Sequence, residues 1–251
     1  MDRWYANLPQ PVPQKERLEQ CKVISHRGEH DNKRVLENTI PAFDEARDRG
    51  VWGLECDVRW TKDLQPVVFH DSDLQRLLHA GLAINDLTLN TLKADFPLIP
   101  TLEEFIIRYG GLLHLMIELK KEAYPDPARQ SQTLQDLLHS LKPGTDFHIL
   151  SLTPDMFGFI NFLQPSALLP VSLLNIRQLS ALTVREKYGG ITGHYAFLQD
   201  YMLAQHQNLG QKVGTGFIFS KNCLFRELNR GVDWIFTNHA AKLQSIRESY
   251  L

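Results

Sequence analysis

Two acidic residues, Glu55 and Asp57, stand two positions apart in the apolar segment WGLECDV. On a β-strand this spacing places both carboxylates on one side, while Cys56 points to the other. Two carboxylates that lie so close repel each other, so a buried pair must hold a proton or bind a cation. A solvated pair on an edge strand is the plain alternative, which the apolar flanks disfavour. The spacing therefore predicts a cation site.

The segment LHLMIELK repeats this arrangement with Glu118 and Lys120, which also share one face of a strand. Glu118 would complete a cage of three carboxylates for a hard divalent ion, Mg²⁺ or Ca²⁺, with Mn²⁺ as a third candidate. Lys120 would then face an anionic substrate. An internal ion pair between Glu118 and Lys120 is the structural alternative, although such pairs are a weak source of stability.

Two histidines follow other strand-like segments, because KVIS leads into His26-Arg27 and PVVF leads into His70-Asp71. Two imidazoles at one rim can divide the acid and base duties of proton transfer, and Asp71 can fix the tautomer of His70. Arg27, together with Lys120, supplies positive charge suited to the non-bridging oxygens of a phosphate. Taken singly, His26-Arg27 is better explained as an ordinary loop pair, and His70 as a structural histidine. Their gathering indicates phosphate-ester chemistry.

These side chains meet only if their segments are parallel strands that end at a common rim. Short β-branched runs alternate with amphipathic stretches along the chain, which is typical of βαβ units. We expect eight strands, at 22–25, 52–58, 66–69, 113–119, 147–152, 168–173, 212–219 and 232–237. Helices are expected at 39–49 and 127–141, and a third begins at the capping box formed by Thr101 and Glu104. Between 175 and 210 the pattern predicts helices but no strand.

The bulk properties indicate one globular domain, residues 1–251, in which 1–20 form an N-terminal lead-in. Its 27 Lys and Arg against 29 Asp and Glu, with no dense basic run, argue against a nucleic-acid partner. The sequence shows neither a leader nor a long apolar run, which predicts a cytoplasmic location without stable membrane insertion. The three widely spaced cysteines predict reduced thiols. Nothing in the sequence indicates the oligomeric state.

Read in order, the motifs HRG, ENT, ECDV, HD and IELK make the chain resemble the glycerophosphodiester phosphodiesterase family. In this sequence the matching stretches are 26–28, 37–39, 55–58, 70–71 and 117–120. The resemblance extends over nearly the whole chain and is dense up to Lys121. It implies a single (β/α)8 TIM barrel with a small insertion after the HD strand, at 72–100.

By that resemblance Glu55, Asp57 and Glu118 bind the divalent cation, His26 and His70 act as general acid and base, and Arg27 and Lys120 hold the phosphate. Supporting roles are expected for Glu37, Asn38, Asp71, Phe217 and Phe219. The implied reaction is hydrolysis of a small glycerophosphodiester to glycerol 3-phosphate and an alcohol. The loop 29–36 and the segment after 212 depart from the family pattern, so the alcohol stays undetermined.

Two other functions stay open at this point. A lysophospholipase D or a phosphatidylinositol-type phosphodiesterase would use the same rim with an apolar lip. Apolar residues in the insertion are candidates for that lip, although packing within the insertion explains them more simply: Leu74, Leu77, Leu78, Leu82 and Ile84. A non-catalytic protein that binds phosphate esters would tolerate the loss of a metal ligand or general acid, and none is missing. The sequence also leaves open whether water or a substrate hydroxyl attacks phosphorus.

Overall fold

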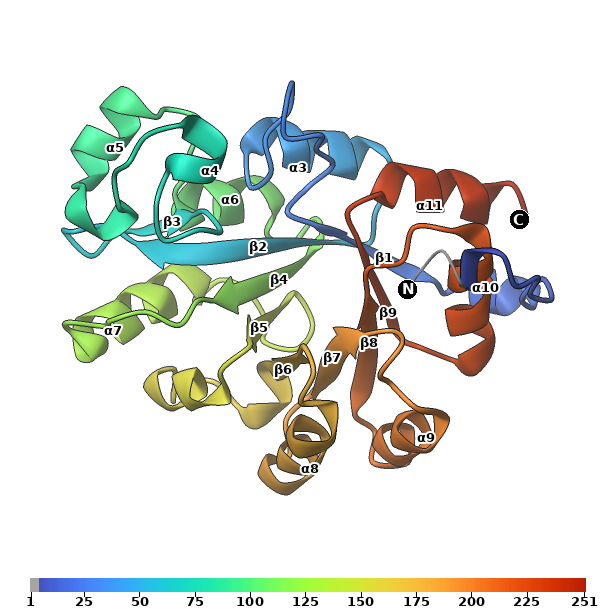
Figure 1. Cartoon of the computed structure of the whole chain (residues 1–251). Helices are drawn as coiled ribbons and strands as arrows, with labels where there is room; N and C mark the ends of the chain where they lie inside the picture. The colour runs from blue at the N-terminus through green and yellow to red at the C-terminus, as the bar shows by residue number, and fades with distance from the viewer. Residues whose placement is uncertain (1–4) are drawn as a thin grey trace.

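The computed structural model describes residues 5–251, and a closed barrel of eight parallel strands lies at its centre (Figure 1). In the order in which they pair, the strands are β1 (Lys22–His26), β9 (Trp234–Thr237), β8 (Lys212–Gly216), β7 (Gly190–His194), β6 (Leu168–Ser172), β5 (Phe147–Ser151), β4 (His114–Leu119) and β2 (Gly53–Trp60). A further pairing of β1 with β2 closes the sheet. The predicted TIM barrel is confirmed. Residues 1–4 of the predicted lead-in lie outside the described part.

The predicted set of eight strands is wrong in one member. The segment predicted at 66–69 forms β3 (Pro66–Val68), which pairs antiparallel with β2 outside the barrel. The missing barrel strand is β7, with the sequence GITGH, in the region where no strand was predicted. Its two glycines and single apolar side chain give no strand pattern, so pairing with β6 and β8 defines it.

Helices connect most of the strands and cover the outside of the barrel (Figure 1). They are α2 (Lys15–Glu19), α3 (Ile40–Asp48), α6 (Leu102–Tyr109), α7 (Pro127–Leu138), α8 (Ile176–Glu186), α9 (Asp200–Asn208), α10 (Lys221–Arg230) and α11 (Ala240–Glu248). The predicted capping box is present at the start of α6, because Thr101 Oγ1 accepts from the Glu104 amide at 3.0 Å and Glu104 Oε2 accepts from the Thr101 amide at 2.7 Å. Between β5 and β6 the described chain forms two short 3-10 turns, η2 (Pro154–Phe159) and η3 (Pro165–Ala167), in place of an α-helix.

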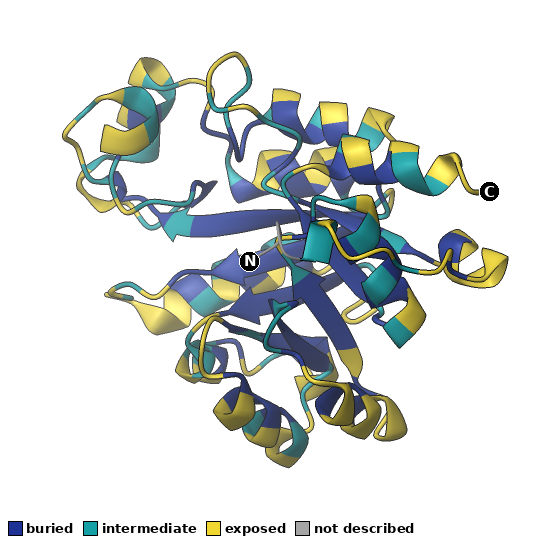
Figure 2. Ribbon diagram, turned by 45° about the vertical axis from the view of Figure 1, so that its right-hand side comes forward, coloured by how far each residue is buried: buried dark blue, intermediate teal, exposed yellow. Residues whose placement is uncertain are grey.

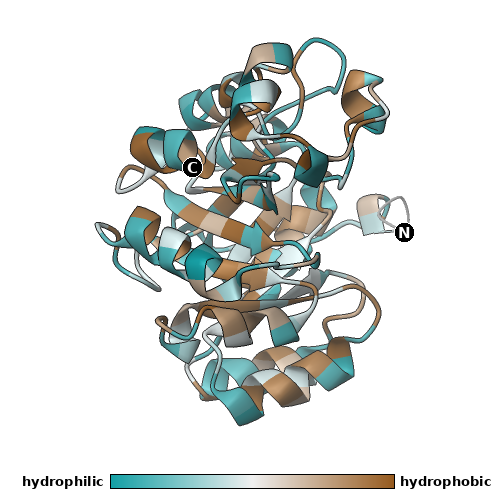
Figure 3. Ribbon diagram, turned by 90° about the vertical axis from the view of Figure 1, so that its left-hand side faces the viewer, coloured by the Kyte–Doolittle hydropathy of each residue, from teal (hydrophilic) through white to brown (hydrophobic). Residues whose placement is uncertain are grey.

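Apolar side chains fill two layers, one on each side of the barrel wall. The outer layer packs the strands against the helices, and it contains Cys56. The inner layer fills the barrel with Ile24, Met116, Leu150, Leu169, Trp234 and Phe236. The strands are buried almost throughout, whereas each helix shows one buried and one exposed side (Figure 2). Polar and apolar residues accordingly alternate along the helices (Figure 3).

The predicted insertion lies between β3 and α6 and contains α4 (Gln75–Leu78), η1 (Ile84–Asp86) and α5 (Leu89–Asp95). It has an apolar core of its own, in which Leu74 and Ile84 are buried and Leu77 and Leu78 are packed against them. Leu82 is exposed. Packing within the insertion therefore accounts for most of these apolar residues. No helix among residues 5–251 is long and apolar enough to cross a membrane.

Gly190 tests the assignment of β7. A Cβ atom there would stand 2.0 Å from the Lys212 carbonyl oxygen of β8, so Gly190→Ala must displace backbone at the barrel wall. We expect it to lower the free energy of unfolding by about 1–3 kcal/mol or more, measured by urea denaturation. Gly158→Ala is the control, because a Cβ atom at Gly158 meets nothing within 4 Å. Equal stability of the two variants would contradict this account of β7.

Candidate active site

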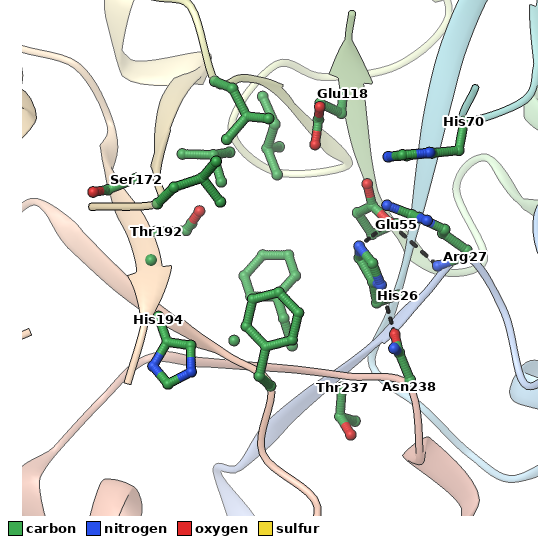
Figure 4. Close-up of a pocket in the computed structure, with 18 of the residues that line it drawn as sticks. His26, Arg27, Glu55, His70, Glu118, Ser172, Thr192, His194, Thr237 and Asn238 are labelled. Carbon is green, nitrogen blue, oxygen red and sulfur yellow. Dashed lines mark hydrogen bonds and ion pairs between the residues drawn. The ribbon is translucent and has the colours of Figure 1, made fainter. Parts of the chain in front are cut away.

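Three buried carboxylates meet at the carboxyl ends of neighbouring strands. Glu55 and Asp57 share the inner side of β2, and Asp57 is the register partner of Glu118 on β4. One oxygen from each of the three lies within 4.8 Å of the others. The structure thus brings together the three acids expected from the sequence, because strand alternation and parallel pairing place them on one face. Figure 4 shows two of them, Glu55 and Glu118.

Two cations lie among these carboxylates. Lys120 Nζ stands 2.6 Å from Asp57 Oδ1 and 2.5 Å from Glu118 Oε1, and Arg27 Nε stands 2.9 Å from Asp57 Oδ2. Burial alone would raise the pKa of Asp57, but the charges of Lys120 and Arg27 bring it below its ordinary value. From the sequence, an internal ion pair between Glu118 and Lys120 was the alternative to a lysine that faces the substrate. It is present, and Lys120 contacts Asp57 as well.

Glu55 is the carboxylate that these cations leave unsatisfied. Burial first, and then the charges of Asp57 and Glu118, raise its pKa well above the ordinary value, and burial also raises the pKa of Glu118. Glu55 Oε1 is buried without a hydrogen-bond partner. Three carboxylates against Lys120 and Arg27 leave one negative charge uncompensated. An oxygen-only donor set with a spare buried oxygen fits a hard divalent cation.

His26 stands at the end of β1, beside Glu55. Its Nδ1 lies 2.6 Å from the amide oxygen of Asn238, which follows β9, so Nδ1 carries the hydrogen and Nε2 is left with a lone pair. Nε2 is 3.7 Å from Glu55 Oε2. Burial and the neighbouring Arg27 charge lower the pKa of His26 to about 4, which keeps the imidazole neutral. Asn238 was missed as a site residue, because the two residues are separated by 212 positions.

The sequence predicted that His70 follows a barrel strand. In the structure His70 instead reaches the site through the hairpin of β2 and β3. Strand β2 continues past the rim, β3 returns antiparallel to it, and the Phe69 amide donates to the Asp57 carbonyl at 2.9 Å. This pairing brings His70 back to the level of the carboxylates. His70 Nδ1 lies 2.7 Å from Asp71 Oδ1, which is the contact expected from the sequence. Nε2 is therefore the ring nitrogen that does not contact Asp71. Burial lowers the pKa of His70.

A second set of residues holds these groups in place. Glu37 Oε1 lies 3.0 Å from Arg27 Nη1 and 2.6 Å from Arg76 Nη2, while Arg76 Nε lies 2.6 Å from Asp71 Oδ2. Asn38 Nδ2 donates to Asp57 Oδ2 at 2.8 Å. The expected supporting residues Glu37, Asn38 and Asp71 are therefore connected to the site. Arg76 lies in the insertion, and sequence reasoning missed it because only the fold brings α4 beside Glu37.

The turn after β1 has a demanding backbone conformation. Arg27 and Gly28 have φ of 61° and 82°, and Asn38 has φ of 58°. A Cβ atom at Gly28 would stand 2.6 Å from the backbone of Ala42 on α3, so only glycine fits this close approach. The HRG motif therefore lets the chain turn sharply and keeps Arg27 over Asp57.

A cavity of about 390 Å³ lies at the carboxyl ends of the strands, and one side of it is lined by His26, Arg27, Glu55, His70, Glu118 and Lys120. Asp57 is fully buried beside Arg27 and Lys120. The cavity also reaches Phe217 and His194, whose rings are stacked with centroids 5.4 Å apart. Figure 4 shows His194 on the side of the cavity away from Glu55 and Arg27. His194 is the last residue of β7, so it was missed as a site residue together with that strand. Phe219 does not line the cavity. It contacts His239, so of the two phenylalanines named from the sequence only Phe217 reaches the site.

Comparison with known proteins agrees with this geometry. The profile of the "Glycerophosphoryl diester phosphodiesterase family" matches residues 26–214, which include every strand from β2 to β7 and all three carboxylates. The chain belongs to this family. The prediction made from the sequence motifs is thereby confirmed, and with it the enzyme class, a phosphodiesterase.

Individual members of the glycerophosphoryl diester phosphodiesterase family match over different lengths. A glycerophosphodiester phosphodiesterase of Caldanaerobacter subterraneus is 45% identical over 71 residues, which is only 28% of either chain. One from Bacillus altitudinis is 26% identical over 90% of this chain and 98% of its own. Among solved structures, an Oleispira antarctica phosphodiesterase in complex with the product sn-glycerol-3-phosphate is 24% identical and covers 90% of this chain and 96% of its own, with a TM-score of 0.75. That likeness supports the barrel fold.

The raised pKa of Glu55 predicts how stability depends on pH without metal. The folded protein keeps a proton on Glu55 above pH 4.5, where the unfolded chain has released it, so stability should fall as pH rises above 4.5 towards the raised pKa. In chelator, the thermal midpoint of the wild type should therefore decrease relative to that of Glu55→Gln between about pH 5 and 8. The comparison removes the opposite effect of buried histidines, whose lowered pKa makes stability rise with pH up to about 6.5. Added Mg²⁺ or Ca²⁺ should raise the midpoint by several degrees at the upper end.

Glu55→Gln removes the buried charge, so it should flatten this pH dependence and weaken the effect of the cation. Glu103→Gln, which changes an exposed carboxylate on α6, should behave as wild type. If the thermal midpoints of wild type and Glu55→Gln depended on pH in the same way, the repulsion inferred among the three buried carboxylates would be contradicted.

Proposed function

We propose that the protein hydrolyses small glycerophosphodiesters to glycerol 3-phosphate and an alcohol, in a reaction that depends on a divalent cation held by Glu55, Asp57 and Glu118. One observation carries the proposal: three buried carboxylates lie together, with an unpartnered oxygen on Glu55, and Glu55 and Glu118 line one cavity with His26, His70, Arg27 and Lys120. The product complex of the Oleispira antarctica phosphodiesterase supports glycerol 3-phosphate as the product. Mg²⁺ and Ca²⁺ are the favoured ions, with Mn²⁺ third.

The cation, when bound, would neutralise a non-bridging phosphate oxygen. Arg27 and Lys120 extend this positive field, since both line the cavity and are held in place by Asp57. Their fixed charges would stabilise the transition state without a reorganisation of water. With a divalent ion, the one surplus negative charge of the cluster becomes one positive charge. That charge matches a phosphodiester monoanion.

The two histidines would move the protons. One neutral imidazole takes a proton at Nε2 from the attacking oxygen as the new P–O bond forms. The other, protonated at Nε2 when the substrate binds, gives that proton to the leaving alkoxide as the old P–O bond breaks. The attacking oxygen belongs to water or to a glycerol hydroxyl of the substrate, which would give a cyclic phosphate first. His70 is backed by the carboxylate of Asp71, and His26 by the neutral amide of Asn238.

The class of non-catalytic phosphate-ester-binding proteins is less well supported. Binding alone does not require two imidazoles in the cavity that the carboxylates Glu55 and Glu118 line, each with its Nδ1 held by a hydrogen-bond partner. The cytoplasmic location also belongs to this proposal, and the three buried cysteines, which form no disulfide within residues 5–251, are consistent with a reducing compartment.

His26→Ala and His70→Ala should each lower kcat by about a hundredfold or more, the usual scale of proton-transfer catalysis. The assay follows glycerol 3-phosphate released from glycerophosphocholine, glycerophosphoethanolamine and glycerophosphoglycerol, first in chelator and then with each cation. His139→Ala, which changes an exposed histidine after α7, is the control. Full turnover in either variant, or undiminished turnover in chelator, would refute the proposal.

Asn238 positions His26, so Asn238→Leu should reduce kcat by about tenfold or more while the fold is kept, because the Nδ1 hydrogen loses its acceptor. The pH profile of kcat should change shape as well, since the tautomer of His26 is no longer fixed. In a His26→Ala background the same substitution should cost nothing further. Additive losses in the double variant would show that Asn238 acts independently of His26.

A further inference from the structure

The cavity has two chemically different walls. The strands β1, β2 and β4 and the hairpin carry its charged residues, whereas the residues that line it from β5 to β9 include no Asp, Glu, Lys or Arg. That second wall is formed mainly by Leu150, Leu152, Val171, Leu173, Phe217 and Phe236. The polar groups there are Ser172, Thr192 and His194, opposite the charged cluster, and Thr237 and Asn238, of which Asn238 bonds to His26 (Figure 4). An apolar surface therefore begins where the phosphate site ends.

The apolar wall has a buried floor and an exposed rim. Leu150 and Phe236 belong to the inner core of the barrel and are 2% and 8% exposed. Leu152 and Leu173 lie two residues beyond Leu150 and Val171, so they continue the same inward side above the rim. Leu173 is 56% exposed and Phe217 is 55% exposed. When an apolar ligand covers apolar side chains that are exposed at the mouth of a cavity, the burial of apolar surface makes its binding more favourable.

Phe217 has a conformation that packing alone does not explain. Its φ is 67°, in the left-handed region that a bulky residue rarely adopts, and most of its ring surface meets neither core nor helix. The ring instead lies between His194, at 5.4 Å, and His26, at 6.5 Å between centroids. Strained residues of this kind gather at binding sites. This position fits a residue that contacts the substrate next to the phosphate.

We infer that the substrate carries a hydrocarbon chain on one side of its phosphate, and that this chain lies along the wall from Leu150 to Phe217. The inference rests on the proposed function, because the charged wall must hold the phosphate. The connection between β5 and β6 consists of short 3-10 turns, and Leu152 and Leu173 follow these two strands. The hydrocarbon chain of the substrate could therefore leave the cavity over the exposed side chains of Leu152 and Leu173.

A quaternary ammonium group, such as choline, is the competing occupant. Aromatic faces attract such cations, and Phe217 and Phe236 line the cavity. Four of the six apolar side chains are aliphatic, however, and no carboxylate lies on that wall. Arg27 and Lys120 in the same cavity would also repel a cation. Aliphatic surface without negative charge favours a hydrocarbon chain.

Binding of alkyl phosphates tests the inference without turnover. With the activating cation present, octyl phosphate should bind at least tenfold more tightly than ethyl phosphate in isothermal calorimetry, because only the longer chain reaches the apolar wall. Leu173→Asp should reduce this ratio at least threefold. Leu174→Asp is the matched control, since Leu174 is the next residue, is 82% exposed and does not line the cavity, and its ratio should stay within twofold of wild type.

A comparison of substrates then shows whether the hydrocarbon chain lies on the glycerol side or on the leaving-alcohol side of the phosphate. Lysophosphatidylcholine carries it on glycerol and glycerophospho-octanol carries it on the leaving alcohol, whereas glycerophosphocholine has none. Below their micellar concentrations, one of the two chain-bearing substrates should exceed glycerophosphocholine at least tenfold in kcat/KM.

Four results would overturn the inference: equal affinity for octyl and ethyl phosphate, equal loss in both leucine variants, tighter binding of phosphocholine than of octyl phosphate, or fastest turnover of glycerophosphocholine. Preference for octyl phosphate without hydrolysis of any substrate would uphold the apolar site and refute the proposed catalysis.

Discussion

The mutual repulsion of three buried carboxylates is the constraint on which the site depends. Glu55, Asp57 and Glu118 are placed side by side by two parallel strands, where water cannot screen their charges. Lys120 and Arg27 compensate only part of this charge. A parallel barrel tolerates such a cluster at its rim because the strands below it are held by apolar packing on both faces.

The hairpin and the insertion complete the site from outside the barrel. Strand β2 extends beyond the rim, and β3 returns along it and brings His70 back to the level of the carboxylates. From the insertion, Arg76 joins Asp71 to Glu37, so the support of His70 and that of Arg27 form one network. Position and charge of the polar wall are therefore fixed by residues that are far apart in sequence.

The asymmetry of the cavity follows from the same architecture. Residues 26–120 supply the charged wall, with its motifs and its second set of supporting side chains, whereas the strands from β5 onward supply short apolar segments and loops. In the proposed binding mode the first half of the chain holds the phosphate. The second half then meets the remainder of the substrate, mainly through Leu, Val and Phe side chains.

Alternation along single strands was sufficient to predict that Glu55 and Asp57 share a face, and motif order was sufficient to predict the family and the barrel. Local patterns failed at β7, whose GITGH segment becomes a strand only between its neighbours, and at β3, where a strand pattern carries no information about direction. Asn238, Arg76 and His194 join the site through pairings that span the chain, so no local signal marks them. The sequence by itself determined which chemistry is present, because residue types and short spacings encode it. Only the tertiary structure decided which side chains hold that chemistry in place and what surface faces it, because closure of the barrel sets the distances between strands.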